Sequence, residues 1–130
     1  MIDPTVQLLL EKAIDTPTKL QLLLIFYENP QLEVTPARMS ERSCRDIWSV
    51  TQALQELAED GVLRVRHGSA RGDVRYAFVP RPEYIEPIRQ LVRNYNDPLE
   101  RDVLHRSIRD LAAYAPFRRQ SAWEPQALVV

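Results

Sequence analysis

The chain has 130 residues, enough for a single domain that buries a hydrophobic core. Hydrophobic residues make up 45% of it and charged residues 27%, a balance typical of globular proteins, and no apolar run reaches the length of about 20 residues that a membrane helix needs. The first residues show no basic leader or cleavage site, and Cys44 is the only cysteine. We therefore expect a cytoplasmic protein without signal peptide, membrane contact or intrachain disulfide.

The net charge of -1 is unevenly distributed along the chain. Residues 1–37 hold two lysines against five acids, whereas residues 38–81 hold eight arginines against six acids. Within residues 61–81, five arginines accompany a single acid, Asp73. A local concentration of positive charge matters more than net charge for contact with phosphates. The sequence is therefore not that of a generally basic nucleic-acid binder, but it contains one candidate basic segment.

Three segments begin with a capping residue followed by proline, the pattern that typically starts a helix. These pairs are Asp3-Pro4, Thr16-Pro17 and Thr35-Pro36. They predict a first helix within residues 3–14, a second helix that Pro30 stops, and a short third helix of two to three turns. Residues 22–27 are apolar on every side, so we expect the second helix at the centre of the core.

Residues 46–60 form the clearest amphipathic pattern, with Asp46 as the expected N-cap and Gly61 as the residue that ends the helix. Its apolar stripe consists of Ile47, Val50, Leu54, Leu57 and Ala58. Residues 62–79 then alternate in the way typical of a β-hairpin. The expected core-facing residues of the hairpin are Leu63, Val65, Val74, Tyr76 and Phe78.

Two more helices are expected at 81–96 and 97–114, and the two prolines of residues 115–130 predict an irregular tail. The later helix has a narrow apolar stripe of Leu99, Val103, Leu104, Ile108 and Leu111. We expect this stripe to be a homodimer seam, with the segment "VQLLLEK" near the N-terminus packed against it. Two-fold symmetry would match a palindromic DNA site. The alternative is that both segments cap the core of a monomer.

This order of elements resembles the winged helix-turn-helix domain over residues 16–80. The resemblance is carried by "TPARMSERSCRDIWSVTQALQELAEDGVLRVRHG" and "GDVRYAF". Similar domains occur in bacterial transcriptional regulators of the MarR, ArsR and PadR types. The resemblance implies a mainly α fold with a small β-hairpin, in which flanking helices at 1–15 and 81–114 extend a winged core within one domain. It also implies a transcriptional regulator that binds double-stranded DNA.

In such a domain the helix at 46–60 enters the major groove, and the wing at 62–79 contacts backbone phosphates. The candidate base-contacting residues are Trp48, Ser49 and Gln52, and the candidate phosphate-contacting residues are Arg42, Arg45, Arg64, Arg66, Arg71 and Arg75. Trp48 has a second interpretation, packing under the wing or against the N-terminal helix, and we favour packing. We expect Cys44 to be half-buried.

Two alternatives stay open at this point. The arginines of the hairpin can form an ordinary solvated face, because arginine is common on exposed strand edges. The whole unit can also be a protein–protein interaction module without nucleic-acid binding, since the helix at 46–60 has several acids and no lysine or arginine. No catalytic motif is present, and His67 and His105 lack partners at metal-ligand spacing. We therefore expect neither an enzyme nor a cofactor. No site for a small-molecule effector is apparent in the sequence, but an unknown effector that binds in a pocket between the dimer helices stays open.

Overall fold

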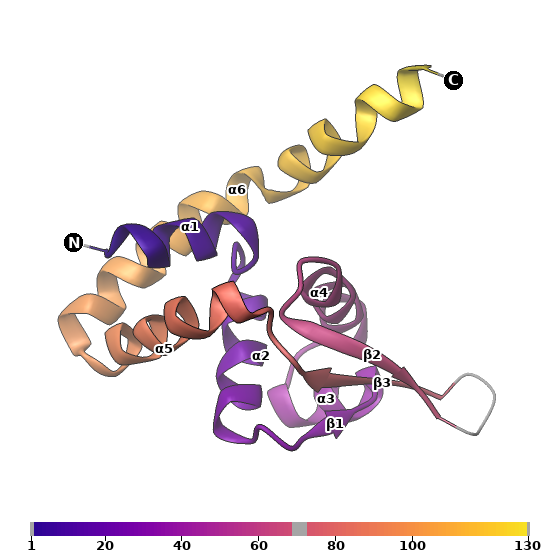
Figure 1. Ribbon diagram of the computed structural model, residues 1–130, viewed down its shortest axis with the longest axis horizontal. Coiled ribbons are helices and arrows are strands. Elements are labelled where there is room, and N and C mark those ends of the chain that lie inside the picture. Colours follow the sequence, from indigo (N-terminus) through magenta and orange to yellow (C-terminus); the bar gives the residue numbers. More distant parts are fainter. Residues whose placement is uncertain (1, 69–72, 130) are drawn as a thin grey trace.

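The structure is a computed structural model that describes the backbone of residues 2–68 and 73–129, with side chains described as far as residue 116. Figure 1 shows a mainly helical chain with a small antiparallel sheet, as the sequence predicts. The elements are α1 (Pro4–Lys12), α2 (Pro17–Glu28), β1 (Glu33–Val34), α3 (Pro36–Ser43), α4 (Ile47–Glu59), β2 (Leu63–His67), β3 (Val74–Phe78), α5 (Pro82–Asn96) and α6 (Pro98–Val129).

The predicted helix starts are confirmed by their capping hydrogen bonds. The side chains of Asp3, Thr16 and Thr35 each accept a bond from a backbone N–H in the first turn of α1, α2 and α3, and proline stands at the start of each helix. The Asp46 carboxylate caps α4 in the same way, at 2.8 Å from the backbone N–H of Ser49. Each cap satisfies a donor that the helix itself cannot pair.

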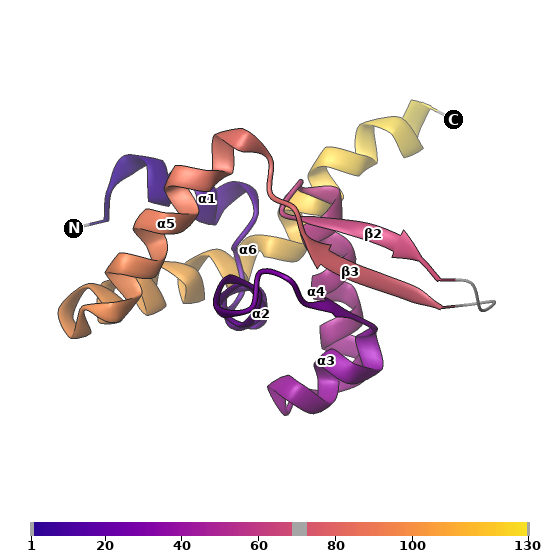
Figure 2. The ribbon, with the colours of Figure 1, turned by 60° about the horizontal axis from the view of Figure 1, so that its bottom comes forward.

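Helix α2 occupies the centre of the core. Leu22, Leu23 and Phe26 are completely buried, which explains why this segment is apolar all round. Figures 1 and 2 show α2 between two groups of elements, with α1, α5 and α6 on one side and α3, α4 and the sheet on the other. Helix α2 contacts elements of both groups, so the core is continuous across the chain.

The sheet has the strand order β1-β3-β2, with both pairings antiparallel. The hairpin of β2 and β3 is confirmed, and the two-residue strand β1 is an addition that the sequence did not predict. In β1, Val34 pairs with Tyr76 and Glu33 with Ala77. Two residues are too few to show the period-2 alternation of a strand, so pairing with β3 alone defines β1.

The C-terminal segment differs from the expectation of an irregular tail at 115–130, because α6 continues from Pro98 to Val129. Figure 1 shows its last part projecting beyond the other helices. A proline inside a helix removes one hydrogen-bond donor and favours a kink. It need not end the helix where the flanking residues are good helix formers, as in the segment "LAAYA" before Pro116.

The apolar stripe of α6 that was expected to form a dimer seam packs largely against other helices of the same chain. Leu104 and Ile108 of α6 are completely buried and belong to the same core as α1 and α5. The segment "VQLLLEK" lies in α1, which packs on α5 and α6. Of the stripe, only Leu99 is strongly exposed, at 81%. Within the single chain these helices thus pack on the core, as in the alternative interpretation of the stripe, and homodimerisation stays a prediction. Among the residues that the structure describes, every helix is too short or too polar to cross a bilayer.

Candidate nucleic-acid interface

The turn between α3 and α4 is tied to α2 by Gln21. The Gln21 side chain donates to the carbonyl oxygen of Ser43 at 3.0 Å and accepts a hydrogen bond from Nε of Arg45. Cys44, at the end of α3, has left-handed backbone geometry (φ 58°) and an exposed side chain, so the expectation that it is half-buried was wrong. The left-handed residue ends α3 and turns its side chain outward. Arg45 is therefore engaged in fixing the start of α4.

The buried residues of α4 are Val50, Ala53, Leu54 and Leu57. Its exposed residues are Ile47, Trp48, Ser49, Gln52, Gln55 and Glu59, and of these Trp48, Gln52, Gln55 and Glu59 lie opposite the buried side. Trp48 is 80% exposed, so the expectation that it packs was wrong. The physical reason is helical geometry. Trp48 stands two residues before Val50, which turns it by about 200° from the buried side. The prediction that Gln52 points away from the core is confirmed, because its side chain is exposed.

Ser49 and Gln52 also border a hollow of about 410 Å³ between α4, the start of α2 and α6. From α6 the hollow is lined by Ala112, Ala115 and Pro116. Both exposed residues, Ser49 and Gln52, therefore border the side of α4 that faces α6. The sequence could not predict this, because the position of α6 relative to α4 depends on the packing of the whole chain.

Lys19 forms a buried charge cluster beside this hollow that sequence analysis missed. Its ammonium group lies 2.7 Å from the Asp15 carboxylate and 2.6 Å from the Glu56 carboxylate, and the lysine is 1% exposed. Glu56 also accepts a hydrogen bond from the Gln52 side-chain amide at 3.0 Å. One acid of α4 is thus neutralised by a lysine of α2. The sequence did contain one indication of this cluster: a lone lysine in an apolar helix, four residues after an aspartate with which it could pair.

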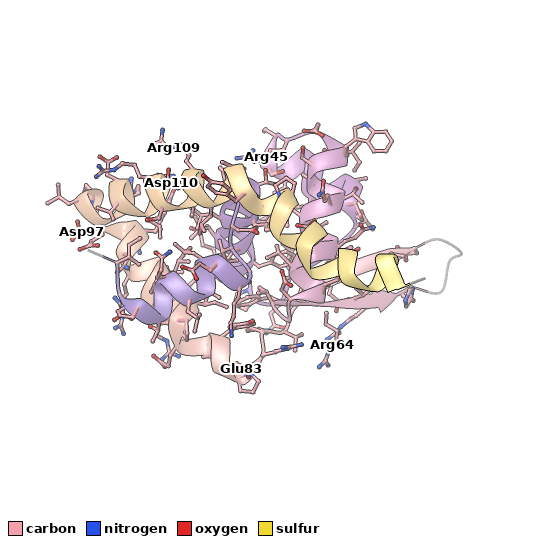
Figure 3. All side chains as sticks on the ribbon, turned by 90° about the horizontal axis from the view of Figure 1, so that it is seen from above. Arg45, Arg64, Glu83, Asp97, Arg109 and Asp110 are labelled. Carbon is pink, nitrogen blue, oxygen red and sulfur yellow. The ribbon has the colours of Figure 1, made fainter. Side chains whose placement is uncertain are left out.

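Three of the candidate arginines extend from the same face of the sheet. Arg66 pairs directly with Arg75 across the two strands, and Arg64 lies two residues before Arg66 on β2. All three are exposed, and Figure 3 shows Arg64 pointing away from the ribbon. Arg66 contacts the Glu33 carboxylate at 3.1 Å and Arg75 contacts Asp73 at 3.4 Å. The two carboxylates offset part of the repulsion between these facing like charges, and Arg64 adds a further positive charge to the same face. Arg71 lies outside the described residues.

A groove of about 570 Å³ between α3 and the sheet brings Arg42 and Arg75 together. These two residues are more than thirty positions apart in the chain and were both candidates from the sequence. The groove is also lined by Arg38, which the sequence analysis did not select, and by Glu33 and Glu41. Arg38 and Arg42 stand one helical turn apart on the exposed side of α3. This spacing in the sequence could have indicated that Arg38 lies beside Arg42.

Arg45 is separate from this arginine group. In the view of Figure 3 it lies on the opposite side of the molecule from Arg64. It borders a different hollow, formed mainly by α2 together with Tyr95 and His105. The structure therefore brings together Arg42, Arg64, Arg66 and Arg75, adds Arg38, and leaves Arg45 apart.

Within the part of the chain that the structure describes, no group of three histidine, cysteine, aspartate or glutamate side chains could hold a metal ion. No protein-family model, curated protein or solved structure matches this chain. Its function must therefore be inferred from its own geometry.

Proposed function

We propose that this protein binds double-stranded DNA through a winged helix-turn-helix unit formed by residues 16–80, and that it acts as a transcriptional regulator. The observation that carries the proposal is the meeting of Arg42 and Arg75 in one groove with Arg38. This groove adjoins the sheet face from which Arg64 and Arg66 extend. Five arginines from α3 and the hairpin thus form one basic surface, and phosphate is the anion that nucleic acids present at regular spacing.

The two parts of the interface have different tasks in this proposal. Helix α4 offers polar side chains on an exposed face, and a helix fits the major groove, where base edges can be distinguished. The arginines of α3 and of the hairpin hold phosphates, which positions α4 without reading sequence. Arg45 stabilises the start of α4 through Gln21 and is no longer among the proposed phosphate contacts.

Electrostatic attraction in this proposal comes from a few arginines, because the chain as a whole has a net charge of -1. Each phosphate contact releases condensed counterions, so the binding constant falls steeply as salt increases. Glu56, an acid of the proposed recognition helix, has its charge compensated by Lys19 and adds little repulsion.

The test is a titration of labelled duplexes from a random pool, followed by fluorescence anisotropy at several salt concentrations. We expect binding by the wild type and, for the double variant Arg42→Gln/Arg75→Gln, a salt slope smaller by about two. The matched control is Arg93→Gln/Arg106→Gln, which removes two exposed arginines of α5 and α6. Failure to bind any duplex would exclude the proposal, as would equal losses in the two double variants.

A protein-binding role without DNA is the second candidate. It is favoured by the 80% exposure of Trp48, since tryptophan is enriched at the centre of protein interfaces. The same titration separates the two candidates. This second role predicts that no duplex binds, and that Trp48→Ala removes a protein partner that co-purifies from the native cell.

A further inference from the structure

We propose that the exposed face of α4 selects A·T base pairs, with Trp48 contacting thymine methyl groups and Gln52 and Gln55 contacting adenine. This inference rests on the proposed DNA binding and adds the identity of the bases. It also adds Gln55 to the candidate residues and gives the buried Lys19 cluster a role in orienting a base-reading side chain.

The three side chains share one face of α4. They follow one another at spacings of four and three residues, which are the spacings of neighbours on a helix surface. Each is exposed, whereas the opposite side of α4 is buried in the core. Trp48 lies in the first turn, and the N-terminal part of a recognition helix is the part that contacts base edges. Glu59, on the same face, is the last residue of α4 and lies farthest from that end.

The chemistry of this face matches A·T pairs better than G·C pairs. Guanine is most often read by arginine or lysine, and α4 has neither between Ile47 and Glu59. A glutamine amide offers an acceptor for the adenine amino group and a donor for the adenine N7 atom. The Trp48 ring is apolar at its surface, and the thymine methyl is the apolar group of the major groove.

Gln52 is held in place by the buried cluster. Its amide nitrogen donates to one oxygen of Glu56 at 3.0 Å, and the other oxygen of Glu56 lies 2.6 Å from the Lys19 ammonium. The bond to Glu56 uses one N–H of the Gln52 amide, which leaves its second N–H and its oxygen for a base. Although this bond lies at the surface, the Lys19–Glu56 pair holds its acceptor in place and so favours one direction of the amide before DNA arrives, which lowers the conformational entropy lost on binding.

The first experiment is the selection of bound duplexes from a random pool with wild-type protein, followed by two chemical changes in the best site. Replacing thymidine by deoxyuridine removes only the methyl group and should weaken binding about fourfold. Replacing deoxyadenosine by its 7-deaza analogue removes the N7 acceptor and should weaken binding about tenfold.

The second experiment repeats both changes with variants of α4. Trp48→Ala should bind thymidine and deoxyuridine sites equally well while keeping its sensitivity to 7-deazaadenine. Gln52→Ala should keep its sensitivity to deoxyuridine and lose the 7-deaza effect at the adenine that Gln52 contacts, while the effect at the adenine that Gln55 contacts remains. Glu56→Gln should reduce the effect at the first adenine without removing it. Gln31→Ala, an exposed glutamine outside α4, is the control and should behave as the wild type. Circular dichroism verifies that each variant is folded.

The outcomes distinguish this inference from the proposed function. If no duplex is selected at all, DNA binding itself is wrong and base selection is wrong with it. If duplexes are selected but their core is G·C-rich, DNA binding stands and the inference is overturned. Equal discrimination between thymidine and deoxyuridine by the wild type and by Trp48→Ala also overturns it.

Discussion

At the scale of single residues, Lys19 is the most constrained side chain of the candidate site. Its ammonium group is withdrawn from water and depends on the carboxylates of Asp15 and Glu56 for compensation. Removing one partner from a buried ion pair leaves an uncompensated charge, which costs more than removing the whole pair. The Glu56 contact also joins α2 to α4, so Lys19 links the central helix to the proposed recognition helix.

We expect Lys19→Met to destabilise the protein by about 3 kcal/mol, because two carboxylates then lose their cation. Urea unfolding followed by circular dichroism measures this change. The triple variant Lys19→Met/Asp15→Asn/Glu56→Gln should recover part of the loss, and Lys12→Met, at an exposed position, should stay within about 0.5 kcal/mol of the wild type. A loss in Lys19→Met no larger than that of Lys12→Met would contradict the structural role of this cluster.

Cys44 provides the second prediction at this scale. Left-handed backbone geometry costs a residue with a Cβ about 1–2 kcal/mol, and a β-branched side chain more. We therefore expect Cys44→Gly to raise the free energy of unfolding by about 0.5 kcal/mol and Cys44→Val to lower it by more than 1 kcal/mol. Thermal unfolding measures both variants. Equal stability of the glycine and valine variants would argue against the left-handed turn.

At the scale of elements, the N-terminus of α4 is defined by the Asp46 cap. The backbone N–H of Ser49, and then its hydroxyl, donate hydrogen bonds that lower the pKa of Asp46 below its ordinary value of 3.8. The ionised carboxylate is therefore favoured in the folded state. Its contribution to stability is fully present above the ordinary pKa and is lost as the pH falls through the lower pKa of the folded state.

The expected consequence concerns Asp46→Asn, which keeps a capping side chain but cannot ionise. Its thermal midpoint should lie below that of the wild type at pH 7, and the two midpoints should converge by pH 2. Asp110→Asn, an exposed change in the middle of α6, is the control and should show no such convergence. If the midpoints of Asp46→Asn and the wild type differ equally at both pH values, the charge of the cap is unimportant.

The helix starts could be predicted from the sequence because each cap depends on residues within one turn. Thr16, Thr35 and Asp46 need only a nearby backbone N–H to perform their role. The exposure of Trp48 follows from the same local geometry, because Trp48 lies opposite Val50 on α4. The burial of Lys19 could not be predicted in this way, since it depends on an acid supplied from α4.

The dependence on contacts between distant segments also explains why β1 and the grouping of the arginines were not predicted from the sequence. Strand β1 exists because β3 pairs with it, and its two residues have no periodicity of their own. The meeting of Arg38, Arg42 and Arg75 depends on the position of α3 relative to the sheet, which no local pattern contains. Local signals thus defined most helices and the hairpin, whereas the arrangement of the candidate site required the folded chain.

At the scale of the whole molecule, α2 makes one core out of two groups of elements. Phe26 of α2 is completely buried and stacks on Phe78 of β3 with ring centroids 6.3 Å apart. Helix α2 also contacts α6. Disturbing α2 should therefore destabilise the flanking helices and the sheet together.

Phe26→Ala should lower the free energy of unfolding by about 3–5 kcal/mol, since it leaves a cavity at the centre of the core. Unfolding should remain a single transition, and circular dichroism of the helices should give the same midpoint as amide exchange in β3. Leu8→Ala, at a half-exposed position of α1, is the control and should change stability far less. Separate midpoints for the helices and the sheet would indicate two independent units.

The position of β2 at one edge of the sheet has a consequence for handling the protein. In the described part of the chain β2 pairs only with β3, so its other side presents free backbone groups that a second copy could join. Arg64 and Arg66 are exposed on this strand, and their charges oppose such growth into a continuous sheet. Replacing them by apolar residues would promote aggregation that imitates a loss of binding. Glutamine, which removes the charge and remains polar, is therefore the informative substitution at both positions.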